Sequence, residues 1–259
     1  MEVNYSKLSD YGITLEIDNG ILFYPCCESD IAGPLFLFQD YINTFYFVDF
    51  NFTINRMNPS GKIIGDIIEP FILEQESITE IKSAPQTIEY EMSDNRTRFY
   101  RDKEPKIYTF IYGNKDNNDL KYELNLYKRF GIFALYYLHK KIDLFFYRND
   151  SLGEGGSGNY WNTHPSITLV LSKLKNGGYI ITDGSNSFGS HGDYKFIRIL
   201  EEDKIDRYGN QFQYIGKFVN RNRMWDDNKV WRIWKNPDLE NNERFIRDMG
   251  LCKKMFLHL

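Results

Sequence analysis

The sequence has few cysteines and histidines, and none has the spacing of a metal site or a disulfide framework. Its 259 residues include three cysteines and four histidines. Cys26 and Cys27 are adjacent, which suits neither a disulfide framework nor a zinc knuckle, and the histidines are scattered. We expect no metal centre. No histidine lies at a local spacing to activate either thiol, so we expect both cysteines to be buried small side chains rather than nucleophiles.

The chain also lacks long apolar runs and a strong charge of one sign. No run approaches the roughly 18 residues that span a bilayer, and the opening MEVNYSKLSDYG lacks the basic and apolar regions of a signal peptide. We therefore expect a cytoplasmic protein without a membrane segment. The net charge of −4 provides no overall attraction for nucleic acid, so such a partner is disfavoured, although a local basic patch is compatible with this composition.

No fixed-period repeat, low-complexity tract or proline-rich linker divides the chain. Apolar residues make up 42% of the sequence and aromatic residues 17%, which is enough to bury one sizeable core. We therefore predict a single domain over residues 1–259.

Two strand–crossover–strand units are visible in the apolar pattern. In the first, GILFYPC (Gly20–Cys26) and NTFYFVDF (Asn43–Phe50) are nearly continuous apolar runs, as parallel strands buried on both faces require. The connector SDIAGPLFLFQDYI predicts a short helix that begins near Pro34, because proline is tolerated in a first helical turn.

The second unit joins KIDLFFYRND (Lys141–Asp150) to YIITDGSN (Tyr179–Asn186). Between them, PSITLVLSKLKNGG predicts a helix with Pro165 in its first turn and Gly177 or Gly178 as the left-handed residue after its end. A right-handed parallel crossover follows from this pattern. We predict that four segments are adjacent parallel strands of one central sheet: Leu22–Tyr24, Phe45–Val48, Leu144–Tyr147 and Ile180–Thr182.

Other segments alternate polar with apolar residues, as half-exposed strands do. In the middle these are QTIEYEM, KIYTFIYG and YELNLYKRF, with GNKDNNDL as a turn between the last two; later they are DYKFIRIL, QFQYIGKFV and KVWRIWK. The last two predict an antiparallel hairpin, and NNERFIRDMG predicts a late helix. The expected fold is therefore α/β, with a Rossmann-like, mostly parallel central sheet, helices on both faces, and additional antiparallel strands in the middle and C-terminal sections.

Parallel α/β sheets bind ligands beyond the carboxyl ends of their strands. Tyr24 to Asp30, Asp49, Arg148 to Gly158 and Asp183 to Asn186 would line that edge. Asp49 follows Glu28 by 49 − 28 = 21 residues, close to the roughly 20 residues at which a carboxylate can accept hydrogen bonds from a ribose. An alternative of equal weight is that Asp49 caps a strand or turn.

FYPCCESD…TFYFVD and LSKLKNGGYIITDGSN resemble the class I S-adenosylmethionine-dependent methyltransferase family, which has a Rossmann-like fold. The resemblance covers about half the chain, Gly20 to Phe50 and Lys141 to Asn186. It implies S-adenosylmethionine as cofactor, with Asp49 on the ribose hydroxyls. The loop that would cradle the cofactor contains Tyr24, Pro25, Cys26, Glu28, Ser29 and Asp30.

The first loop departs from the family pattern, which is usually acidic-x-Gly-x-Gly because only glycine lets the backbone approach the cofactor closely. Here the loop is PCCESD, and no glycine occurs before Gly33. Together with GEGGSG, this loop also resembles those of uncharacterised bacterial proteins of the same general fold.

The stretch IDLFFYRNDSLGEGGSGNYW ends in a loop with four glycines between Gly153 and Gly158, which allows positive φ and could bind an anion. The resemblance implies that this loop faces the methyl group, with Asp150 and Glu154 as catalytic residues. The substrate-binding candidates are Arg148, Asn149, Gly155, Gly156, Ser157 and Asn159. Alternatively, the loop is a surface crossover whose glycines serve only geometry, and Arg148 pairs with Asp150 or Glu154.

Two functions therefore stay open. The first is methyl transfer from S-adenosylmethionine to a small-molecule or protein acceptor, in which positioning provides most of the catalysis. The second is a non-catalytic Rossmann-like module that binds a nucleotide-type ligand or a protein partner. Methyl transfer is the first hypothesis, the missing glycine pattern supports the alternative, and fold alone does not decide between them.

Overall fold

The computed structural model describes residues 5–27, 30–49, 71–80, 87–91, 97–101, 106–147, 161, 166–182, 212–219, 230–236 and 238–257. Its helices are η1 (Leu8–Tyr11), α1 (Ala32–Phe38), α3 (Gly131–Tyr137), α4 (Ser166–Lys173) and α6 (Glu243–Leu257). Its strands are β1 (Gly20–Pro25), β2 (Ile42–Val48), β3 (Phe71–Glu80), β4 (Thr87–Glu91), β5 (Thr97–Arg101), β6 (Lys106–Asn114), β7 (Asn117–Lys128), β8 (Ile142–Tyr147), β9 (Leu174–Thr182), β10 (Gln213–Val219) and β11 (Val230–Lys235).

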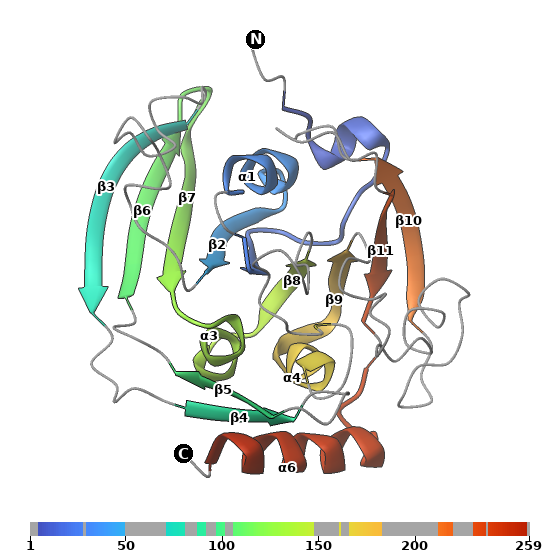
Figure 1. Ribbon diagram of the computed structural model, residues 1–259. Coiled ribbons are helices and arrows are strands. Elements are labelled where there is room, and N and C mark those ends of the chain that lie inside the picture. Colours follow the sequence, from blue (N-terminus) through green and yellow to red (C-terminus); the bar gives the residue numbers. More distant parts are fainter. Residues whose placement is uncertain are drawn as a thin grey trace.

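Among the described residues, nine strands form one sheet in the order β10-β11-β9-β8-β1-β2-β7-β6-β3 (Figure 1). β1 pairs in parallel with both β2 and β8, and the parallel pairing continues to β7 on one side and β9 on the other. The four predicted segments are therefore adjacent parallel strands, which confirms that prediction. The fold is α/β, with a mixed sheet that is parallel at its centre.

The outer strands are antiparallel, as expected for the middle and C-terminal sections. β6 pairs with β7 and with β3, and β11 pairs with β9 and with β10. The β10–β11 pairing confirms the predicted hairpin partners. β4 and β5 form a separate two-stranded sheet that also agrees with a strand predicted at QTIEYEM.

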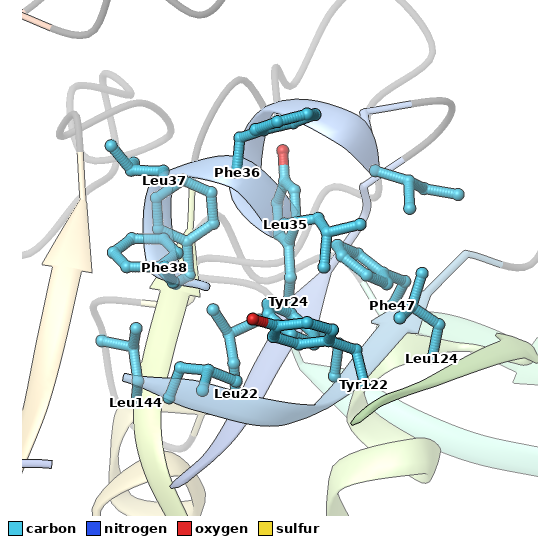
Figure 2. Packing of buried hydrophobic residues seen from close by; sticks show 14 of the residues in the cluster. Leu22, Tyr24, Leu35, Phe36, Leu37, Phe38, Phe47, Tyr122, Leu124 and Leu144 are labelled. Carbon is cyan, nitrogen blue, oxygen red and sulfur yellow. The ribbon is translucent and has the colours of Figure 1, made fainter. Parts of the chain in front are cut away.

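Helices cover both faces of the central strands because those strands are apolar on both faces. Leu22 and Tyr24 of β1 belong to a buried cluster with α1, whereas Phe23 belongs to a second buried cluster with α3 and α4. Alternate side chains of a strand point to opposite faces, so the two clusters are the two faces of the sheet. Figure 2 shows the first cluster, in which Leu35 and Phe38 of α1 lie over the strands.

The helix of the first crossover begins two residues before Pro34, at Ala32, and Pro34 lies in its first turn. This position agrees with the tolerance for proline there. The late helix is also confirmed as α6, which packs on α4 and extends beyond the predicted segment.

The prediction for the end of the second crossover helix was wrong. α4 ends at Lys173, and Leu174 starts β9 instead of continuing the helix. Gly177 does have a left-handed φ of 73°, but it lies in an irregular part of β9 and not at a helix end. There the β8–β9 register shifts, because Ile142 pairs with Leu174 whereas Leu144 pairs with Tyr179. A glycine that allows positive φ suits a strand irregularity as well as a helix end, so the sequence pattern did not distinguish them.

The predicted turn GNKDNNDL was too long, because β7 already starts at Asn117. Asn114 Oδ1 accepts a hydrogen bond of 2.9 Å from the Asp116 backbone N–H. This bond stabilises a tight turn, so the chain reverses its direction within the two residues between β6 and β7. The segments β3, β5 and α3 were not predicted. DYKFIRIL, Pro165 and most of IDLFFYRNDSLGEGGSGNYW after Tyr147 lie outside the described residues.

Gly131, the first residue of α3, lies where the helix meets the end of β1. A Cβ atom there would lie 2.8 Å from Trp161 Cζ2 and 3.1 Å from Pro25 Cβ. Trp161 is fully buried and its ring centroid lies 5.6 Å from that of Phe145 on β8. Residue 131 must therefore be glycine for α3 and Trp161 to pack together over the ends of β1 and β8.

We predict that Gly131→Ala lowers the free energy of unfolding by about 1 to 2 kcal/mol, because the clash outweighs the better helix propensity of alanine. Gly250→Ala in α6 is the matched control, because a Cβ there meets nothing within 4 Å. The control should raise stability by up to about 1 kcal/mol. Urea unfolding of both variants measures the change in the free energy of unfolding. Changes of the same sign in the two variants would contradict the packing described above.

Candidate ligand site at the carboxyl edge of the sheet

The connections from β1 and β8 leave the sheet toward opposite sides. Numbered by their succession in the chain, the five parallel strands β1, β2, β7, β8 and β9 lie in the order 3-2-1-4-5. The order reverses between β1 and β8, and open α/β sheets bind ligands beyond the carboxyl ends of the strands at such a point. We call this region the carboxyl-edge site, defined by Tyr24, Pro25, Cys26, Asp30 and Asp49.

The turn after β1 is held tightly by backbone hydrogen bonds. Cys27 N donates to Val48 O at 3.3 Å, which extends the pairing with β2, and Asp30 N donates to Cys27 O at 2.8 Å. Cys26 has a φ of 56°, in the left-handed region that favours glycine. The backbone therefore adopts at Cys26 a conformation that glycine normally provides.

Asp30 anchors this turn through its side chain. The Tyr24 hydroxyl donates to Asp30 Oδ2 at 3.1 Å. Burial first, and then the charge of Asp30, raise the pKa of the Tyr5 hydroxyl, so Tyr5 also lies near this carboxylate. Asp30 thus ties β1 to the segment that leads into α1.

Asp49 directly follows the last residue of β2 and is half-buried. Its backbone N donates to Tyr127 O at 3.0 Å, and its backbone O accepts from Arg129 N at 3.3 Å. Both bonds involve the main chain, and they hold the Asp49 backbone against the end of β7. The carboxylate is close enough to Cys27 to act on its thiol electrostatically.

Arg129, which the sequence analysis did not single out, lies directly beside Asp49. Its side chain is only 5% exposed. Its guanidinium carbon lies 4.8 Å from the centroid of the Tyr137 ring and 5.7 Å from that of the Phe133 ring, both on α3. The sequence KRFGIFALYY gives no local signal for this role, because the burial of Arg129 depends on β2–β7 pairing and on packing against α3.

The vicinal cysteines differ in their surroundings. Cys27 is 1% exposed, whereas Cys26 is half-buried. Burial, with Asp49 and Asp30 adding to it, raises the pKa of the Cys27 thiol well above its usual range. The expected burial is therefore confirmed for Cys27, while Cys26 is more accessible than expected.

The structure thus brings Tyr24, Pro25, Cys26, Asp30 and Asp49 to one edge. The remaining predicted site residues lie outside the described residues: Glu28, Ser29, Arg148, Asn149, Asp150, Glu154, Gly155, Gly156, Ser157 and Asn159. Within the described ranges, no group of three or more His, Cys, Asp or Glu side chains has the arrangement of a metal site. In the same ranges no helix has both the length and the apolar character needed to cross a membrane.

Two buried polar groups near this edge have no hydrogen-bond partner in the described part of the chain. They are the indole Nε1 of Trp161 and the hydroxyl of Ser166, the first residue of α4. Buried polar groups are usually satisfied, so a missing partner of this kind needs an explanation such as a water or a ligand.

No protein-family model matches the sequence, and no curated protein matches it either. Among solved structures, a conserved hypothetical protein of Streptococcus pyogenes is similar with a TM-score of 0.39 and 8% identity. The similarity covers 85% of this chain and 88% of that one.

We predict that alkylation of the native protein modifies Cys26 first, since Cys27 and Cys252 are buried and the raised pKa of Cys27 leaves little thiolate at neutral pH. Treatment with iodoacetamide at pH 7.5 followed by peptide mass spectrometry measures the order. Unfolding in guanidinium should make the three rates similar. Modification of Cys27 at the rate of Cys26 in the folded protein would contradict the described burial.

The left-handed conformation of Cys26 also predicts how substitutions there affect stability. Cys26→Gly should change the free energy of unfolding by less than about 1 kcal/mol, because relief of the backbone strain offsets the greater freedom of glycine in the unfolded chain. Cys26→Val should lower it by about 2 kcal/mol or more, since a β-branched residue rarely adopts positive φ. Thermal and urea unfolding test this, and a valine variant as stable as the glycine variant would refute it.

Proposed function

We propose that the protein binds S-adenosylmethionine at the carboxyl-edge site and transfers its methyl group to a small-molecule or protein acceptor. The observation that carries the proposal is the strand order 3-2-1-4-5, the Rossmann-like order, with an aspartate at the end of its second strand. A ligand in this fold class lies across the reversal between β1 and β8, next to the turn that contains Cys26.

The glycine-poor first loop fits this ligand better than its sequence indicates. The glycine pattern of the family serves backbone conformation and close approach. Cys26 already has the left-handed φ of 56° that a glycine would supply, so the conformational part of the requirement is met. A non-glycine residue in that region is uncommon and is often found at ligand sites.

The charges at the edge favour this cofactor over phosphate-bearing ones. Asp30 and Asp49 both lie close enough to Cys27 to act on its thiol electrostatically. Two carboxylates repel the phosphates of ATP or NAD but attract a sulfonium cation. S-adenosylmethionine, when bound, supplies an electrophilic methyl group.

The residues of the chain have distinct roles in the proposal. The Asp49 carboxylate accepts hydrogen bonds from the ribose hydroxyls, while its backbone bonds to β7 hold it in place. Asp30 keeps the first turn closed through Tyr24 and contributes negative charge. Trp161 Nε1 and the Ser166 hydroxyl are buried polar groups that a bound ligand could satisfy. Asp150 and Glu154, outside the described residues, orient or deprotonate the acceptor.

The proposal predicts that Asp49→Ala removes detectable binding of S-adenosylmethionine without unfolding the protein. Loss of the charge-assisted hydrogen bonds should weaken affinity by about 2 to 4 kcal/mol. Asp119→Ala is the matched control, because Asp119 is an exposed aspartate near the opposite end of β7. Calorimetric titration of the parent protein and both variants gives the affinities, and unchanged binding by Asp49→Ala would return this residue to a capping role.

A ligand series separates methyl transfer from the non-catalytic alternative. S-adenosylmethionine and S-adenosylhomocysteine at 100 times their dissociation constants should stabilise the protein by about 2.7 kcal/mol, which raises its melting temperature by several degrees. NAD and ATP should have a smaller effect. If none of the four ligands shifts the melting temperature, the alternative of a module that binds a protein partner is favoured.

A further inference from the structure

A polar patch lies on the sheet face opposite α1 and extends from the middle of β7 toward the carboxyl-edge site. In the middle of this face, Tyr46 of β2, Asn125 of β7 and Thr109 of β6 are direct cross-strand partners. Thr44, Glu123 and Ile111 form the adjacent row, toward the opposite edge of the sheet. Paired residues point to the same side of a sheet, so these side chains share one face. We call Tyr46, Glu123, Asn125 and Tyr127 the tyrosine–glutamate patch.

A chain of hydrogen bonds runs through the patch and ends on Glu123. The Thr109 hydroxyl donates to Asn125 Oδ1 at 2.9 Å, and Asn125 Nδ2 donates to Glu123 Oε1 at 2.6 Å. Asn125 is only 5% exposed, so it is a fixed donor that holds the carboxylate in one orientation. Glu123 itself is half-buried and remains reachable from solvent.

The charge of Glu123 is not neutralised within the described part of the chain. No lysine or arginine there lies within ion-pair distance of its carboxylate. The neighbouring lysine on the same face is Lys121, two residues earlier, and its Nζ is engaged 2.6 Å from Glu74 Oε2. A partly buried carboxylate without a cation is unusual, since desolvation penalises an unpaired charge.

Two tyrosines complete the patch. The rings of Tyr46 and Tyr127 meet edge to face with centroids 5.4 Å apart. Burial, followed by the proximity of Tyr127 and Glu123, raises the pKa of Tyr46. Burial also raises the pKa of Tyr127, with Glu123 adding to it and Arg129 opposing it. Both hydroxyls therefore lie within the electrostatic reach of the same carboxylate and stay protonated at neutral pH.

We propose that the tyrosine–glutamate patch binds a cationic group, a primary ammonium or a guanidinium, through the Glu123 carboxylate and the adjacent tyrosine rings. An oriented carboxylate beside aromatic rings is the combination that recognises organic cations, because the ring faces and the anion attract the same charge. The half-buried setting strengthens both attractions relative to bulk water.

This site does not depend on the proposed function. Glu123 precedes Tyr127 by four residues on β7, which separates them by about 13 Å along the strand. Tyr127 in turn pairs with Val48, the residue before Asp49. Glu123 therefore lies at a distance from Asp49, whereas the backbone oxygen of Tyr127 accepts the Asp49 N–H. Glu123→Gln is accordingly the variant that separates failure of the cation site from failure of S-adenosylmethionine binding.

Saturation-transfer NMR titration with two charged probes and their neutral counterparts tests the proposal. The probes are n-butylammonium, with 1-butanol as counterpart, and the peptide acetyl-Gly-Arg-Gly-amide, with its citrulline analogue as counterpart. Glu123→Gln should weaken binding of the charged probe about tenfold, because the amide keeps the shape without the charge. Tyr127→Leu should weaken it several-fold. Glu80→Gln is the control, because Glu80 pairs with Lys106 on the other face of the sheet. This variant should bind the charged probes as the parent protein does.

The arms also identify the source of the cation. Binding of butylammonium indicates a small amine, whereas binding of the arginine peptide alone indicates a side chain of a protein partner, and either result supports the site when Glu123→Gln abolishes it. Equal binding of charged and neutral probes, binding that Glu123→Gln leaves intact, or no binding of either charged probe would overturn the proposal. Unfolding curves of Glu123→Gln confirm that any loss is not caused by unfolding.

Discussion

The parallel pairing of β1 on both sides is the constraint on which the rest of the structure depends. A strand with a neighbour on each edge satisfies its backbone hydrogen bonds within the sheet, and it can then be apolar on both faces only if both faces are covered. Leu22 and Tyr24 therefore require α1, and Phe23 requires α3 and α4. The connections must leave β1 and β8 in opposite directions to provide those layers, which creates between these two strands the kind of reversal at which open α/β sheets bind ligands.

The negative charges at the carboxyl edge of the sheet also affect the reactivity of the nearby thiol. Asp30 and Asp49 lie close enough to Cys27 to raise the pKa of its thiol beyond the effect of burial. The same charges that make this thiol a poor nucleophile make the edge attractive to a cation. The two carboxylates and the burial of Cys27 thus disfavour a covalent mechanism through this thiol.

The apolar runs predicted the central strands because burial on both faces leaves a local signal in the sequence. The first loop and Asp49 could be placed at one edge for the same reason, since parallel strands end together. Other elements leave no such signal. GIFALYY forms α3 without a capping side chain, and its aromatic residues resemble those of a strand. Gly177 has the expected positive φ, but the choice between a helix end and a strand irregularity depends on pairing with β8. Arg129 becomes a neighbour of Asp49 only through β2–β7 pairing.

The tyrosine–glutamate patch illustrates why some sites cannot be found along the chain at all. Tyr46 and Asn125 are 79 residues apart in number (125 − 46 = 79) and meet only because β7 pairs with β2. In sequence, YELNLYKRF is an ordinary alternating strand in which Glu123 would be assigned to a solvated face. The register instead pairs Tyr46 of β2 with Asn125, whose side-chain amide donates to Glu123. A shift by one residue would exchange this face for Tyr122 and Leu124, which pack under α1. The burial of those two side chains therefore fixes the register that assembles the polar patch on the opposite face.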